Sequence, residues 1–268
     1  ALHHKPAFKN CICTGLLMAE GGQKLSKRLK NYPDPAMVLD KIGSDTLRWF
    51  LVSSPVLKGG NLAVDQEGKE IVKAARVAQI PFWNAFYFFT LYANAEGYKA
   101  KEVSTSDESL DNYILSKLKK LSAEVKKGLD TYDVAHSCSE IAAFMEVLNN
   151  WYIRRTRDRR ASGLRPATGR FWTGDNQAFD GLYTVLVNLC KIMAPLMPFT
   201  TEYVYQALVD AEASVHLTDY PLLEDVAADD ELVRQMDFVQ ELCSAGKFVR
   251  EEKNLRNRLP LNKLTVAG

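Results

Sequence analysis

The chain has 268 residues, of which 47% are hydrophobic and 25% are charged, values typical of one or two globular domains with a substantial core. Its 34 Lys and Arg residues nearly balance 33 Asp and Glu residues, which excludes a globally basic protein, so any nucleic-acid surface must come from local clusters. Five scattered cysteines argue against a disulfide framework, and the most apolar run, residues 78–95, is interrupted by polar residues and predicts a buried helix rather than a membrane span.

The first patterned segment is the run at residues 10–17, in which apolar and polar positions alternate. This alternation predicts a strand that places Cys11 and Cys13 on one face. Zinc-binding pairs normally have wider spacing and a second pair of ligands. We therefore expect these thiols to pack against the protein, and we expect no metal site in the chain.

A short loop with two lysines follows the predicted strand. Gly21 and Gly22 can act as a hinge, and Lys24, Ser26 and Lys27 come directly after them. Point charges, a small hydroxyl donor and a flexible backbone are the parts that a phosphate-binding loop needs. The alternative is a solvated surface loop without a ligand. In either case residues 20–29 are expected to be the most mobile internal segment.

Short helices are predicted next. Pro35 suits the first position of a helix over residues 36–42, and Ser44 or Asp45 can cap a second helix over residues 46–52. A glycine-rich loop at residues 59–61 closes this region, and almost every later segment reads as helical.

The rest of the chain carries long amphipathic stripes at helical spacing. They predict helices over residues 71–92, 110–125, 134–152 and 179–193, a shorter helix after Thr200, and a last one over residues 230–252. Pro81 predicts a kink in the first of them. Several such helices with short connections predict an antiparallel bundle, interrupted by one long exposed loop at residues 161–175.

Basic residues gather in four places: the lysine loop, the helix at 110–125 with the turn after it, residues 154–160, and residues 247–258. In the second cluster, Lys119 and Lys120 fit either a solvated helix face or an RNA contact. In the third, Arg155 and Arg159 extend the apolar stripe of their helix. They are therefore predicted to point inward and pair with acids such as Glu202.

Other residues of the third cluster face elsewhere by the same spacing. Arg154, Arg157 and Arg160 are predicted to contact RNA phosphates. Trp151 either stacks on a base or packs within the bundle.

Several motifs now resemble one family. Lys24-Leu25-Ser26-Lys27-Arg28 resembles the Lys-Met-Ser-Lys-Ser signature loop of class I aminoacyl-tRNA synthetases, with Leu25 and Arg28 as departures. The string Asn-Trp-Tyr-Ile-Arg-Arg at residues 150–155 resembles the anticodon-domain helix of that class. Ser-Val-His-Leu at residues 214–217 is similar to the isoleucyl type. The resemblance covers about residues 6–261, residues 161–170 look like an insertion, and the family's His-Ile-Gly-His motif would precede Ala1.

The resemblance implies a mainly α fold, in which an antiparallel anticodon-binding bundle is preceded by a small α/β remnant of the catalytic domain. It also implies four divisions of the chain: the end of the catalytic domain with the lysine loop (1–34), stem-contact helices (35–66), the anticodon-binding bundle (67–222), and a last helix with a junction region (223–268).

The implied function is part of ATP-dependent charging of tRNA(Ile) with isoleucine. Lys24 and Lys27 would be catalytic cations that bind ATP together with Ser26, in the presence of magnesium, and this fragment would be inactive alone. The residues expected to bind tRNA are Trp151, Arg154, Arg157, Arg160, Lys119 and Lys120. A cytoplasmic monomer without membrane contact is expected.

Three alternatives remain open. The chain could be a non-catalytic tRNA-binding or scaffold module, the equivalent fragment of a valyl- or leucyl-tRNA synthetase, or a helical protein-interaction bundle.

Overall fold

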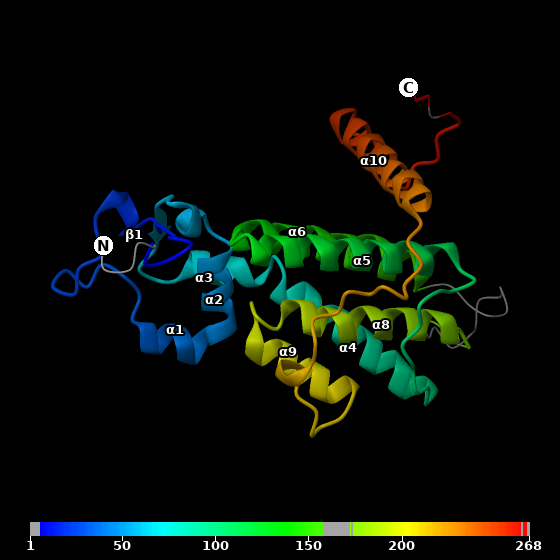
Figure 1. Cartoon of the computed structure of the whole chain (residues 1–268). Helices are drawn as coiled ribbons and strands as arrows, with labels where there is room; N and C mark the ends of the chain where they lie inside the picture. Colours follow the sequence, from blue (N-terminus) through cyan, green and yellow to red (C-terminus); the bar gives the residue numbers. More distant parts are fainter. Residues whose placement is uncertain (1–5, 158–171, 173, 264, 267–268) are drawn as a thin grey trace.

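The computed structural model describes residues 6–157, 172, 174–263 and 265–266. A bundle of long helices lies beside a smaller N-terminal part, and the last helix stands away from both (Figure 1). The fold class expected from sequence, a mainly α antiparallel bundle preceded by a small α/β part, is confirmed.

The N-terminal part contains a two-stranded parallel sheet. β1 (Leu17–Ala19) pairs with β2 (Leu62–Val64), which the sequence did not predict. The strand expected over residues 10–17 is wrong except for its last residue, because pairing with the short β2 begins at Leu17, with one further hydrogen bond from the Leu62 amide to the Leu16 carbonyl at 2.9 Å. Cys11 and Cys13 are consequently exposed rather than packed. Gly15 is required here, since a Cβ atom at this position would lie 1.8 Å from the Gly60 carbonyl oxygen.

Two helices, α1 (Pro35–Lys41) and α2 (Ser44–Val52), follow as predicted. The Asp34 carboxylate caps α1 by accepting a hydrogen bond from the Ala36 amide at 2.9 Å. The expected cap of α2 is wrong: Gly43 occupies the N-cap position, and neither Ser44 nor Asp45 bonds to this helix end. A small hydrophobic core joins these elements to α3 (Lys69–Ala75). It consists of Val38, Phe50, Val64 and Ile71.

The expected kink at Pro81 is a complete break. α3 ends at Ala75, and α4 (Gln79–Glu96) begins after a turn at residues 76–78. Pro81 lies in the first turn of α4, where a missing amide hydrogen is tolerated, so the helix restarts just ahead of the proline.

The bundle itself is built from α4, α5 (Ser109–Asp130), α6 (Val134–Glu146) and α8 (Asn176–Met193). α5 and α6 form a hairpin across one side, and α4 and α8 cover the other (Figure 1). Their shared core contains fully buried side chains from each helix, including Phe82, Leu118, Ile141 and Leu186.

The third long helix is not regular. After α6, residues Val147–Ile153 form a π-helical segment (η3), and α7 (Arg154–Thr156) continues the same path. Hydrogen bonds in a π-helix join residue i to residue i+5, so a turn takes in one additional residue and the helix face shifts.

The chain ends with α9 (Pro198–Leu208), a short 3-10 turn η4 (Val215–Leu217) and α10 (Asp230–Glu252). The bounds of α10 match the predicted range of 230–252. Within the described residues, no helix is both long and apolar enough to cross a membrane.

Candidate nucleic-acid interface and lysine loop

The lysine loop is a compact turn. β1 leads into a 3-10 turn, η1 (Glu20–Gly22), in which Gly21 and Gly22 have left-handed φ angles of 80° and 79°. Glycine adopts this conformation without the strain that a Cβ atom would introduce. The Ala19 amide then donates to the Gln23 carbonyl at 2.7 Å, and the chain reverses direction.

Asn31 organises the lysine side of this loop. Its Oδ1 accepts from the Ser26 amide at 2.8 Å, and its Nδ2 donates to the Lys24 carbonyl at 3.2 Å. The Ser26 hydroxyl accepts from the Leu29 amide at 3.4 Å. Lys24 and Lys27 are exposed, and within the described residues neither forms an ion pair. Sequence reasoning missed Asn31, although an asparagine shortly after a charged turn is a known bonding partner for turn backbone.

The inward orientation predicted for Arg155 is wrong. Arg155 is exposed, and its guanidinium carbon lies 4.7 Å from the centroid of the Trp151 ring. The π-helical segment shifts the helix face by one residue, so Thr156 takes the buried position instead. Glu202 does not pair with Arg155; its carboxylate accepts from the Val215 amide and from Gln206.

Trp151 is partly buried, with Arg155 over its ring. The indole Nε1 is buried and has no hydrogen-bond partner among the described residues. A base that stacked on this ring would use the face that Arg155 leaves open, or would displace the guanidinium.

Arg154 and Arg157 are exposed, as is Asn150. Spacings of four and three residues place such side chains along one face of a helix. The two arginines therefore continue the helix face that begins at Asn150, a residue that lines a cavity between α4 and the third helix. Arg159 and Arg160 lie outside the described residues.

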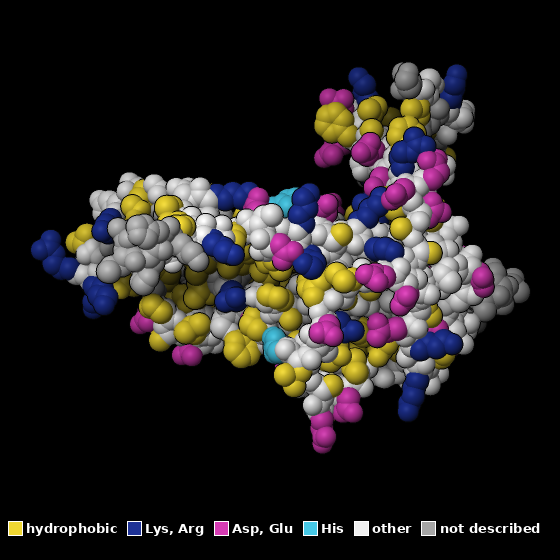
Figure 2. Space-filling view, in the orientation of Figure 1, with side chains coloured by type: hydrophobic (Ala, Val, Ile, Leu, Met, Phe, Trp, Pro, Cys, Tyr) yellow, Lys and Arg dark blue, Asp and Glu magenta, His cyan; other side chains and the backbone are white. Residues whose placement is uncertain are grey.

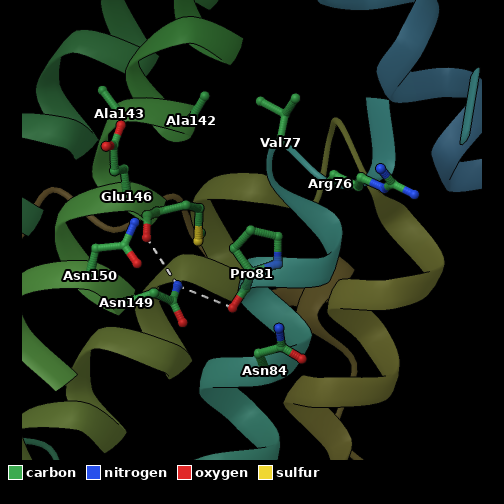
Figure 3. Close-up of a pocket in the computed structure, with 10 residues that line it drawn as sticks. Arg76, Val77, Pro81, Asn84, Ala142, Ala143, Glu146, Asn149 and Asn150 are labelled. Carbon is green, nitrogen blue, oxygen red and sulfur yellow. Dashed lines mark hydrogen bonds between the residues drawn. The ribbon is translucent and has the colours of Figure 1, made fainter. Parts of the chain in front are cut away.

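A cavity of about 490 Å³ opens between the start of α4 and the junction of α6 with the π-helical segment (Figure 3). Its polar lining consists of Arg76, Asn84, Glu146, Asn149 and Asn150. Amide side chains present both donors and acceptors, and the remaining walls are apolar. This combination suits a planar polar group such as a nucleobase.

Asn149 fixes one wall of the cavity. Its Nδ2 donates to the Pro81 carbonyl at 3.2 Å and to the Met145 carbonyl at 3.0 Å, so it ties α4 to the third helix (Figure 3). The sequence analysis did not single out the cavity residues. The two adjacent asparagines before Trp151, Asn149 and Asn150, are the sequence feature that could have indicated a polar cavity here.

Lys119 and Lys120 hold the chain that leads into α10. The Lys119 ammonium donates to the carbonyls of Glu224 and Val226 at 3.1 and 2.7 Å, and Lys120 lies 2.7 Å from an Asp230 carboxylate oxygen. Both lysines are thus already engaged.

No group of three or more metal-ligating side chains gathers in the part of the chain that the structure describes.

Residues 111–265 match the family described as the anticodon-binding domain of tRNA ligase, and residues 1–63 match the class I tRNA synthetases of the I, L, M and V types. The chain is 45% identical to the Isoleucine--tRNA ligase of Corynebacterium efficiens over 99% of its length, and 44% identical to that of Leifsonia xyli over its whole length. It spans only 24% and 23% of these two relatives.

Among solved structures, the fold is similar to a LeuRS of Agrobacterium radiobacter K84 in a ternary complex with tRNA and LeuAMS, with a TM-score of 0.51 at 18% identity. The match covers 82% of this chain and 24% of that one. At this level of identity the likeness concerns the fold alone.

Proposed function

The chain belongs to the family of tRNA ligases that carry this anticodon-binding domain, and we propose that it is the part of an isoleucine–tRNA ligase that holds tRNA(Ile) and brings the lysine loop to ATP. The identity of 45% to an Isoleucine--tRNA ligase over nearly the whole chain supports this specificity. The chain spans about a quarter of such relatives, so the complete charging reaction belongs to a longer protein.

The lysine loop has the chemistry that adenylate formation requires. When isoleucine attacks the α-phosphate of ATP, negative charge grows on the departing pyrophosphate. Lys24 and Lys27 are exposed cations that would contact these phosphates. The Ser26 hydroxyl, whose oxygen accepts from the Leu29 amide, would donate its own proton to a phosphate oxygen. Magnesium would be held mainly by the phosphates, as is usual for this ion. Gly21 and Gly22 would serve as the hinge on which the loop closes.

One observation supports the proposal that this chain binds RNA: Arg154 and Arg157 are exposed and continue a helix face beside the amide-lined cavity. Arginine side chains suit backbone phosphates, and the cavity can take a base. Trp151, which does not line the cavity, would stack on a different base. Arg160 extends the same set in sequence. Lys119 and Lys120 are turned toward the chain that leads into α10, where they bond to backbone carbonyls and to Asp230, and we therefore assign them a smaller share.

The test is tRNA binding by the 268-residue chain with Arg154→Gln and Arg157→Gln combined. A tRNA(Ile) transcript should bind about tenfold more weakly, and the dependence of log K on log salt should become shallower by about two. The matched control is Lys119→Gln with Lys120→Gln, which removes the same charge and should weaken binding less. Unchanged binding by the arginine variant, with an unchanged melting temperature, would exclude this face.

The same proposal includes three further points. The chain divides into four parts at residues 34, 66 and 222, it is a monomer, and it is located in the cytoplasm. Size-exclusion chromatography coupled to light scattering tests the monomer directly.

A further inference from the structure

The last helix leaves the bundle halfway along its length. In its first half, the Asp237 carboxylate accepts hydrogen bonds from Tyr113 and Lys117, and Gln240 donates to the Tyr113 hydroxyl. Within the described residues, no side-chain hydrogen bond or ion pair joins residues 241–263 to the bundle. α10 projects away from the other helices (Figure 1). Within the described residues, the polar contacts of its second half are therefore local ones.

The chain after α10 folds into a defined loop around Arg250. The Leu255 amide donates to the Arg250 carbonyl at 2.8 Å and closes the helix end. The Arg250 guanidinium then donates through Nη1 to three backbone carbonyls, those of Arg256, Asn257 and Leu259, at 3.1, 3.4 and 2.8 Å. One arginine thereby holds residues 256–259 of the segment 253–263, which we call the basic arch.

The basic arch has four cations, Lys253, Arg256, Arg258 and Lys263, and contains no acidic residue. All four are exposed, and none forms an ion pair within the described residues. The lysines of α5 differ, because several are paired with carboxylates, among them Lys117 and Lys120. A cation without a carboxylate partner binds a phosphate without losing an existing ion pair. Within the described residues, the cations of the arch therefore have fewer ion pairs than the lysines of α5.

We infer that the basic arch is a separate RNA-binding element that contacts backbone phosphates. The inference rests on the proposed function, since it assumes that the bundle binds tRNA. Phosphate contacts position an RNA without reading its sequence, so the arch contributes affinity that is the same for different tRNAs. Arg250 is a positioning residue: it holds the loop backbone and leaves the four cations to the ligand.

The experiment measures binding of a tRNA(Ile) transcript to the 268-residue chain carrying Arg256→Gln and Arg258→Gln. Affinity should fall about tenfold at low salt, and the salt dependence should become shallower by about two. The control is Lys69→Gln with Lys73→Gln on α3, which removes the same charge from lysines that are paired with Glu67 and Glu70. This control should change affinity less than about twofold. A transcript of another tRNA should lose affinity equally when the arch is changed.

Each other outcome contradicts a specific claim. If the arch variant binds like the parent while the Arg154 and Arg157 variant does not, the arch is excluded and the proposed function stands. If the parent chain does not bind tRNA at all, the proposed function fails. An equal loss of tRNA affinity in the α3 control would show that the effect comes from net charge and not from the arch. Competition by polyglutamate as strong as that of tRNA would assign the arch to acidic proteins instead.

Discussion

Asp45 shows how a single residue acts far from its own helix. It lies in the first turn of α2, and its carboxylate is buried. Instead of capping α2, it accepts hydrogen bonds from the amides of Phe199 and Thr200 at 3.4 and 2.6 Å. These amides belong to the first turn of α9 and have no partner inside that helix. Asp45 therefore joins the N-terminal part to the bundle.

Replacing Asp45 with Ala should lower the free energy of unfolding by about 1–2 kcal/mol, because the start of α9 loses its cap. The matched control is Ser44→Ala, one residue earlier, where the exposed hydroxyl caps nothing and the change should stay within about 0.5 kcal/mol. Urea denaturation monitored by circular dichroism measures both. Equal losses in the two variants would contradict the role assigned to Asp45.

At the scale of the element, the π-helical segment decides which arginines reach solvent. A regular helix through Tyr152 would have placed Arg155 inward, where it would have needed an acid. The additional residue in the π turn moves Thr156 to that position, and its hydroxyl bonds to the Tyr152 carbonyl at 2.8 Å. The same segment holds Asn149 and Asn150 at the cavity. One irregular turn therefore shapes both the arginine face and the hollow beside it.

Docking of α10 on α5 depends on a neutral tyrosine. Burial raises the pKa of the Tyr113 phenol, and the Asp237 carboxylate, 2.7 Å away, raises this pKa further. The folded-state pKa therefore lies above that of the unfolded chain. Such a group stabilises the fold fully below the unfolded value of about 10 and loses this contribution as the pH rises beyond it.

We therefore expect α10 to detach as the pH rises above about 10. Amide hydrogen exchange of α10 should accelerate relative to that of α8 in this range. Tyr113→Phe should show a weaker alkaline acceleration, because the group that ionises is gone. The other buried tyrosines are present in both proteins, so the difference between them isolates Tyr113. An identical alkaline response in the two proteins would contradict the assignment.

At the scale of the whole molecule, the lysine loop and the two proposed RNA surfaces lie on different parts. The loop extends from the small N-terminal sheet, whereas the arginine face belongs to the third helix and the arch follows α10. Lys and Arg side chains are scattered over the visible face, with Asp and Glu between them (Figure 2). This mixture agrees with the net charge of +1 and leaves RNA attraction to local groups.

The isolated chain should not catalyse isoleucine-dependent exchange of pyrophosphate into ATP. Lys24, Ser26 and Lys27 are on an exposed loop, and none of them lines the amide-lined cavity beside α4. A cation accelerates the reaction only where it meets the developing charge in a positioned site. The full-length relative from Corynebacterium efficiens is the positive control. Exchange by the isolated chain above background would contradict this prediction.

Local patterns in the sequence determined most of the helices and the position of the lysine loop, but not the complete break between α3 and α4. The bounds of α10 and the N-terminal proline of α1 follow from periodicity and capping, which act over a few residues. The mobility expected for residues 20–29 stays a prediction. The resemblance of residues 24–28 and 150–155 to motifs of class I synthetases also rests on short strings.

Tertiary structure decided which partners these elements meet. Periodicity assumes regular turns, so it could not show the π segment that turned Arg155 outward. Nor could it show that Asp45 bonds to α9, or that Lys119 binds carbonyls more than 100 residues away, because both depend on packing between distant segments. The arginine face, the amide-lined cavity and the basic arch exist only once the helices are assembled, since each is defined by contacts that the chain order alone does not contain.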